Sequence, residues 1–165
     1  MSMPMHRRDV LRLMLLMGVS GISLGVAGCG KDESGKPRAI KLGRDVCEHC
    51  TMLISDPAYA AQLWDPVRGQ QHLFDDIGCA TMYAAENGIP DGPETRVWVA
   101  SSERPGEWLD ARAAFFRTDA RSPMGYNYAA MGGAGAQRID FTTMRTQAIE
   151  RGLCRAPGAE RMQRG

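Results

Sequence analysis

Sulfur-bearing side chains are concentrated in one short segment, CEHCTM at residues 47–52. In a turn, residues i and i+3 can face one point, so Cys47 and Cys50 can approach the same ion. In extended backbone, residues i and i+2 share a side, which brings Cys50 and Met52 together. Thiolate and thioether form a soft ligand set, and such sets select Cu(I). The segment therefore predicts a copper site at Cys50 and Met52, with Cys47 as an additional ligand.

The same spacing leaves two interpretations without copper open. A structural zinc site usually takes two such cysteine pairs, and the sequence shows no second pair. A redox pair normally opens a helix that follows a strand, whereas residues 51–57 (TMLISDP) predict no helix. A thiol–disulfide oxidoreductase that uses Cys47 and Cys50 nevertheless stays open. So does a non-metal assembly adaptor in which the pair forms a small disulfide.

Two histidines and one carboxylate are the other polar residues weighed as ligands. Adjacent side chains point apart in extended chain, so His49 is expected in solvent rather than beside Cys50 on a metal. His72, in an expected strand, and Asp75 are candidates for a secondary role. Asp75 is better suited to cap a helix, because a carboxylate is a hard ligand and Cu(I) is a soft ion.

The other cysteines of the expected domain are Cys79 and Cys154. On an expected helix, Cys79 and Met82 share one face, which predicts that both side chains pack in the core. A disulfide between Cys79 and Cys154 is the alternative, because an oxidising compartment permits it. The sequence leaves this choice open.

The N-terminal segment has the pattern of an export signal. A segment with a net positive charge, residues 6–12, precedes an apolar run at residues 13–27, and this run is too short for a typical membrane-spanning helix. The sequence VAGC at residues 26–29 resembles a lipobox, which implies palmitate or a related lipid on Cys29 and removal of residues 1–28. The paired arginines fit either twin-arginine or general secretory export. We expect a lipid-anchored, periplasm-facing protein, and Gly30 favours the outer membrane.

Composition excludes several classes of function. The chain has 165 residues, 44% of them hydrophobic and 24% charged, which is typical of a folded globular protein. A formal net charge of +1 indicates no binding surface for nucleic acid. The sequence contains no nucleophile elbow, phosphate loop, dinucleotide fingerprint or zinc-protease motif. We therefore expect a protein that is not an enzyme.

The elements expected around the sulfur segment are those of an α+β fold with a small antiparallel sheet and two helices. A flexible tether at 29–44 precedes a domain at 45–155 and a polar tail at 156–165. Turn residues between two apolar runs predict a hairpin, and aspartates before two apolar stretches predict capped helices. The expected strands are 59–64, 70–74, 96–101, 107–111 and 113–117, and the expected helices run from Asp75 or Asp76 to Asn87 and from Asp140 or Thr142 to Arg151.

An ordered set of motifs over residues 45–130 resembles the NosL family. The set begins with Cys-x-x-Cys-x-Met-x-Ile-x-Asp at residues 47–56, and every later motif follows in the family's order. The later motifs are AAQL at 60–63, FDDIGC at 74–79, the strand at 97–100, EWLDARAAF at 107–115 and SPMGY at 122–126. After Ala130 the match fades.

The resemblance implies a periplasmic lipoprotein that acts as a copper chaperone in denitrification. Its members carry Cu(I) for maturation of nitrous oxide reductase, particularly of its copper–sulfide cluster, with an ABC-type transporter and a periplasmic maturation partner. The implied fold is similar to the small domain of organomercurial lyases. Cys50 and Met52 match the family's Cys-x-Met pair, Met124 matches a third sulfur ligand, and Cys47 is an additional candidate. Thr51 stands where glycine is common in the family.

Overall fold

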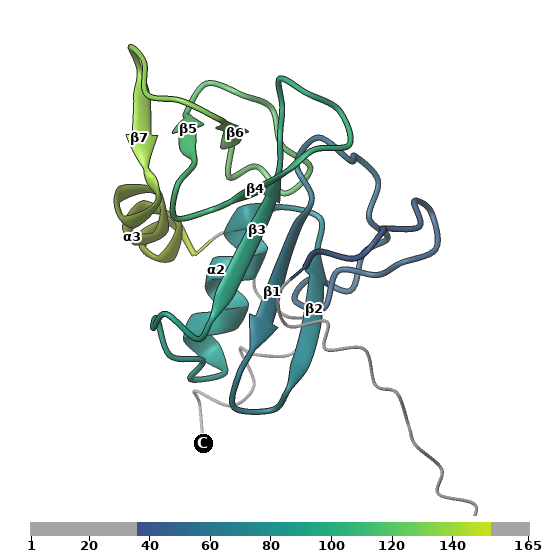
Figure 1. Cartoon of the computed structure of the whole chain (residues 1–165). Coiled ribbons are helices and arrows are strands. Elements are labelled where there is room, and N and C mark those ends of the chain that lie inside the picture. Colours follow the sequence, from purple (N-terminus) through teal and green to yellow (C-terminus); the bar gives the residue numbers. More distant parts are fainter. Residues whose placement is uncertain (1–35, 153–165) are drawn as a thin grey trace, which may run out of the picture. The chain divides into compact units, whose positions relative to one another are not determined.

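The computed structural model describes residues 36–152, which form two antiparallel sheets and two helices (Figure 1). These residues all belong to one of the two units into which the chain divides. The expected signal, the lipidation site Cys29, most of the tether, Cys154 and the polar tail lie outside the described residues. Neither described helix has the length and apolar character needed to cross a membrane.

A four-stranded sheet of order β2-β1-β3-β4 contains the expected hairpin. Its strands are antiparallel and run Ala61–Asp65 (β1), Gln70–Phe74 (β2), Arg96–Ala100 (β3) and Trp108–Asp110 (β4). In the hairpin turn, a carboxylate oxygen of Asp65 accepts from the Val67 amide at 2.8 Å, and Gly69 has a φ of +64°. This turn fixes the β1–β2 register, in which Ala61 faces Phe74.

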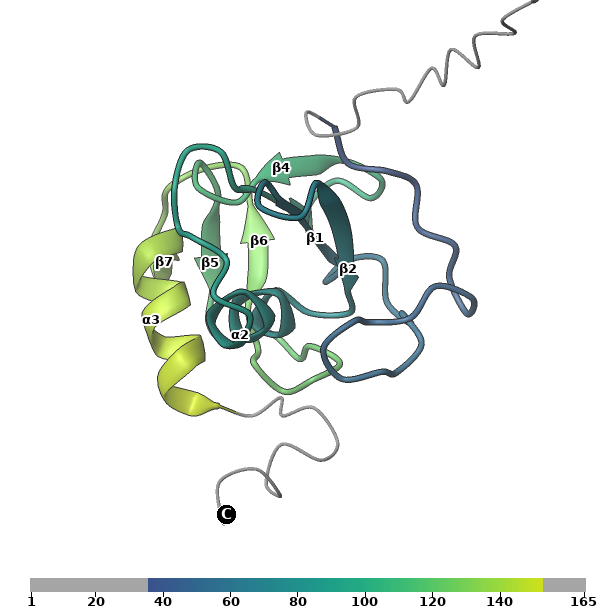
Figure 2. The ribbon, with the colours of Figure 1, turned by 90° about the horizontal axis from the view of Figure 1, so that it is seen from below.

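Helix α2, Ile77–Glu86, follows β2 directly and packs against β1, β2 and α3 (Figure 2). Asp76 rather than Asp75 is its N-cap, and the Asp76 side chain accepts from the Gly78 amide at 2.9 Å. Most of the helix is buried because β1, β2 and α3 all pack against it. The helix ends before Gly88, whose φ of +63° favours glycine.

A three-stranded sheet of order β6-β5-β7 completes the fold. Its strands are Phe115–Arg117 (β5), Ala129–Met131 (β6) and Arg138–Asp140 (β7). Helix α3, Phe141–Arg151, starts at the Asp140 cap and ends at Gly152, whose φ is +53°. Strands β6 and β7 were not expected, because each has only three residues, which is too short to show alternation, and each depends on pairing with β5.

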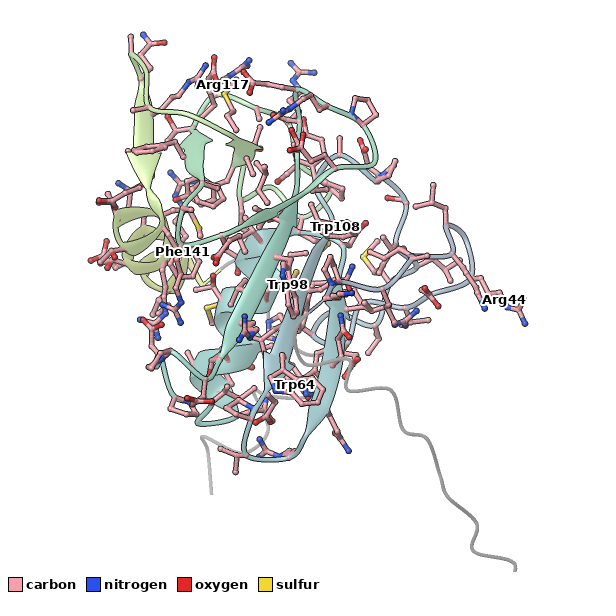
Figure 3. All side chains as sticks on the ribbon, in the orientation of Figure 1. Arg44, Trp64, Trp98, Trp108, Arg117 and Phe141 are labelled. Atoms are coloured by element: carbon pink, nitrogen blue, oxygen red, sulfur yellow. The ribbon has the colours of Figure 1, made fainter. Side chains whose placement is uncertain are left out.

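Residues before the expected domain start also contact the sheet. The Arg38 amide donates to the Gln62 side-chain oxygen at 2.9 Å, and the Gln62 amide group donates back to the Arg38 carbonyl at 2.8 Å. Gln62 lies opposite Trp98 in the β1–β3 register, and Figure 3 shows the tryptophans distributed along this sheet. Ordered contacts therefore begin before Asp45.

Candidate metal centre

The sulfur segment forms a closed loop rather than a helix. Val46 pairs with Leu53 in an isolated bridge, and the Cys47 amide donates to the Met52 carbonyl at 2.8 Å. The Thr51 amide then donates to the Cys47 carbonyl, also at 2.8 Å. Thr51 has a φ of +63°, a conformation that is unusual for a β-branched residue and natural for glycine. The closed backbone holds Cys47 and Cys50 at the two ends of one tight turn.

Strand β2 and the residue after it hold this loop from both sides. The Glu48 amide donates to the Leu73 carbonyl at 3.0 Å, and the Leu73 amide donates to a Glu48 carboxylate oxygen at 3.3 Å. Beyond the loop, the Ser55 amide donates to the Asp75 carboxylate at 2.9 Å. Asp75 is buried, and its observed contact braces the backbone that follows the loop. The loop is therefore fixed against the start of α2.

Three cysteine side chains meet at this junction. The Sγ atoms of Cys47, Cys50 and Cys79 all lie within 4.8 Å of one another, and the three residues are thiols. Their exposed fractions are 0%, 8% and 0%. Three sulfurs placed ~2.3 Å from one ion in a trigonal plane are ~4 Å apart, so small adjustments suffice for a shared ion. Within residues 36–152, no second group of three His, Cys, Asp or Glu ligand atoms is this compact.

The thiols also change one another's acidity. A hydrogen bond from the Cys79 side chain is the largest influence and favours the Cys47 thiolate, whereas burial opposes it. The backbone amides of Cys50 and Asp75 and the Cys50 side chain add further hydrogen bonds. Together they lower the pKa of Cys47 from 9.0 to about 5. The lowered pKa favours the thiolate of Cys47, which is the form that binds metals and attacks disulfides.

The two predicted methionine ligands lie in different surroundings. Met52 is 54% exposed at the rim of the loop, where its carbonyl holds the Cys47 amide. Met124 is partly buried and packs against the core. Its segment reaches α2, because a Cβ on Gly78 would overlap the ring of Tyr126. The loop and the Met124 segment therefore approach the same first turn of α2.

The histidines support the loop. His49 is 2% exposed, with its Nδ1 atom 3.5 Å from a Glu86 carboxylate oxygen, so the expectation that it is solvated is wrong. The reason is that Glu86, at the C-terminal end of α2, lies next to the loop and covers His49. His72 is also buried, and its Nδ1 atom lies 2.6 Å from the Glu48 carboxylate. Its Nε2 atom lies 4.0 Å from Asp65.

Cys79 is the site residue that sequence reasoning missed. Its expected burial is confirmed, but its thiol faces the loop cysteines rather than only apolar neighbours. Helical spacing with Met82 explained the residue without any metal. The sequence signal that could have indicated a site role for Cys79 is its position just after Asp75 and Asp76. A cysteine in the first turn of a capped helix lies close to any loop that packs against the start of that helix.

Comparison with known proteins supports the fold. No protein-family model matches the chain, and no curated protein matches its sequence. Among solved structures, the chain is similar to the copper chaperone NosL from Shewanella denitrificans, at 16% identity and a TM-score of 0.50. The similarity covers 70% of this chain and 87% of that one. The expected NosL-like α+β fold is confirmed, and its loop and α2 carry a three-thiol group that can hold a metal.

Proposed function

We propose that this chain is a Cu(I) chaperone and not an enzyme. The observation that carries the proposal is the convergence of Cys47, Cys50 and Cys79 within 4.8 Å at the junction of the loop and α2. Cysteines from two separate elements meet there, which a small CxxC disulfide does not require. The fold it shares with a copper chaperone supports the same function.

The donor set suits Cu(I) better than zinc. Thiolates and thioethers are soft ligands, which Cu(I) prefers, and Met52 and Met124 add thioether sulfur on the loop and on a segment that reaches α2. A structural zinc site is closed by four ligands, and the described group has three. Cys50 is common to the three-thiol group and to the Cys50–Met52–Met124 set that the family resemblance implies.

Transfer rather than turnover is the proposed activity. Met52 is half-exposed beside buried thiols, so a partner's soft ligand can approach the loop and take the ion by stepwise exchange. We propose that the recipient pathway matures nitrous oxide reductase, particularly its copper–sulfide cluster, through an ABC-type transporter and a periplasmic partner. A lipid on Cys29 would keep the chain at the periplasmic face of a membrane, close to such machinery.

One observation favours a second candidate function. The lowered pKa of Cys47 and the nearby Cys50 thiol also suit a thiol–disulfide oxidoreductase. That function requires a cycling dithiol pair and makes Met52 dispensable. A non-metal adaptor, the third interpretation, requires no Cu(I) binding at all.

The test is an anaerobic Cu(I) titration of the reduced chain from residue 30 onward against a chromogenic Cu(I) chelator. The proposal expects one ion per chain or per dimer, held in competition with the chelator, and loss of that binding in Cys50→Ser. Met144→Leu is the control for loss of a sulfur atom outside the cysteine loop, because Met144 is fully buried in α3. If the wild-type chain takes no copper from the chelator, the proposal is wrong and the redox or adaptor function remains.

A further inference from the structure

We infer that Cys79 is a Cu(I) ligand, so that the ion rests in a buried three-thiolate site completed by α2. This inference rests on the proposed copper function. It differs from the ligand set that the family resemblance implies, in which Cys50, Met52 and Met124 hold the ion. In the three-thiolate site, Met52 serves to move the ion outward.

The thiols that would hold the ion and the methionine that would pass it on differ in their exposure to solvent. Cys47 and Cys79 are inaccessible to solvent, Cys50 is 8% exposed, and Met52 is 54% exposed. An ion bound among the three thiols is therefore shielded, whereas an ion on Met52 is open to a partner. Cys50 is the only thiol of the three with measurable exposure, and it lies two residues from Met52 along the loop.

Cys79 is held in place independently of the loop. The Asp76 cap accepts from the Gly78 amide at 2.9 Å, which fixes the first turn of α2. The Tyr126 ring packs directly on Gly78, so the turn cannot shift toward that side. The Sγ atom of Cys79 therefore has a fixed position. The hydrogen bonds that the loop makes to Leu73 and Asp75 hold Cys47 and Cys50 next to it.

The charges near the thiols are compatible with anionic sulfur. Backbone amides of Cys50 and Asp75 point at the Cys47 sulfur, and Cys79 itself lies in the first turn of a helix, where N–H groups are directed outward. Two carboxylates that hold the loop have other partners: Asp75 accepts from the Ser55 amide, and a Glu48 carboxylate oxygen lies 2.6 Å from Nδ1 of His72.

The chemistry balances without any redox step. When Cu(I) binds, Cu–Sγ bonds form and the remaining thiol protons pass to solvent, while copper and sulfur keep their oxidation states. During transfer, the Cu–Sγ bonds of Cys47 and Cys79 break as the Met52 sulfur and a soft ligand of the partner bond to the ion. Cys50 keeps its bond longest because it lies nearest the exposed rim.

The experiment compares equilibrium affinity with transfer rate in the chain from residue 30 onward. Reduced variants are titrated with Cu(I) against a chromogenic chelator, and transfer to excess chelator is followed by stopped flow. Cys79→Ser is expected to weaken Cu(I) binding at least ~10-fold, whereas Met52→Leu changes it less than ~3-fold but slows transfer at least ~10-fold. Met144→Leu is the control for loss of a thioether, and circular dichroism checks that Cys79→Ser folds.

A wild-type measurement keeps the inference testable if Cys79→Ser unfolds. The copper-loaded and copper-free chains are unfolded rapidly in the presence of iodoacetamide, and alkylation of each cysteine is quantified by mass spectrometry. Delayed labelling of Cys79 with copper supports the inference, and unchanged labelling overturns it. Loss of affinity in Met52→Leu equal to that in Cys50→Ser also overturns it, while the copper function survives. Absence of any Cu(I) binding by the wild-type chain is instead the failure of the proposed function.

Discussion

The Sγ atom of Cys79 in helix α2 lies within 4.8 Å of the Sγ atom of Cys50, although the whole β1–β2 hairpin separates the two residues in the sequence. The loop that carries Cys50 reaches α2 because Glu48 and Ser55 bind β2 and the residue after it. The metal centre is thus a product of tertiary structure. Changes that move either the loop or the first turn of α2 should weaken it.

Gly78→Ala should displace the first turn of α2. A Cβ at this position would overlap the Tyr126 ring, and overpacking of this kind costs about 1–3 kcal/mol or more. We expect a lower free energy of unfolding in urea and weaker Cu(I) binding. Gly92→Ala is the matched control, because a Cβ there meets nothing within 4 Å. Equal stability of the two variants would contradict the close contact.

Thr51→Gly and Thr51→Ala should differ in stability. Both lose the hydroxyl that donates to the Cys50 carbonyl, but only alanine keeps a Cβ at a φ of +63°. The left-handed backbone conformation costs a residue with a Cβ about 1–2 kcal/mol. Glycine avoids this cost, but it loses more backbone conformational entropy on folding, which offsets part of the gain. We expect Thr51→Gly to unfold at higher urea than Thr51→Ala, by about 1 kcal/mol. The reverse order would mean that the loop carries no such strain.

Glu48→Ala should loosen the cysteine loop. The Glu48 carboxylate accepts from the Leu73 amide and lies 2.6 Å from the His72 ring. Losing these contacts should lower stability by about 1 kcal/mol and speed hydrogen exchange of the Thr51 amide, which donates within the loop. Glu48→Gln keeps an acceptor and serves as the control. Exchange at Thr51 that is equally slow in both variants would show that Glu48 does not hold the loop.

Asp65 should make stability depend on acid pH. Burial is the largest influence and raises the pKa of this carboxyl, yet the hydrogen bonds and charge of Arg68, with the Val67 amide, lower the pKa below 3.8 overall. Its stabilising effect is therefore complete above about pH 3.8 and is lost as the pH falls through the lowered pKa. Asp65→Ala should cost about 2 kcal/mol at neutral pH, because Asp65 is fully buried.

The effect of Asp65 on stability can be measured as a function of pH. In urea unfolding from pH 7 to pH 2, the difference between the wild-type chain and Asp65→Ala should shrink below about pH 3.8. Asp119→Ala is the matched variant, because Asp119 pairs with Arg117 on the surface and should matter much less. A difference for Asp65→Ala that stays constant down to pH 2 would contradict the ionised role of this carboxylate.

Local signals predicted most of the secondary structure. The Asp140 cap and Gly152 mark α3 almost to the residue, and the Asp65–Gly69 turn defines the β1–β2 hairpin. These features are readable because each depends on neighbouring residues. Strands β6 and β7 have no such local signal and form only where β5 offers backbone groups.

Only part of the candidate site could be predicted from the sequence. The CxxC segment and Met52 stood out by their spacing, and Thr51 marked a position suited to glycine, as its φ of +63° agrees. The environment of His49 and the sulfur of Cys79 depend on where α2 lies, which no local pattern encodes. The ligand roles of Cys47, Cys50, Met52 and Met124 stay predictions until copper is bound.

The central claim is that sulfur atoms of this junction hold Cu(I), and X-ray absorption of the copper-loaded chain tests it most directly. The extended fine structure should fit about three sulfur neighbours at ~2.3 Å, and the edge should be that of Cu(I). Cys79→Ser should remove one of these sulfurs, leaving Cys47 and Cys50 as the remaining thiols of the group. A first shell of nitrogen or oxygen, or a sulfur count unchanged by Cys79→Ser, would contradict the account.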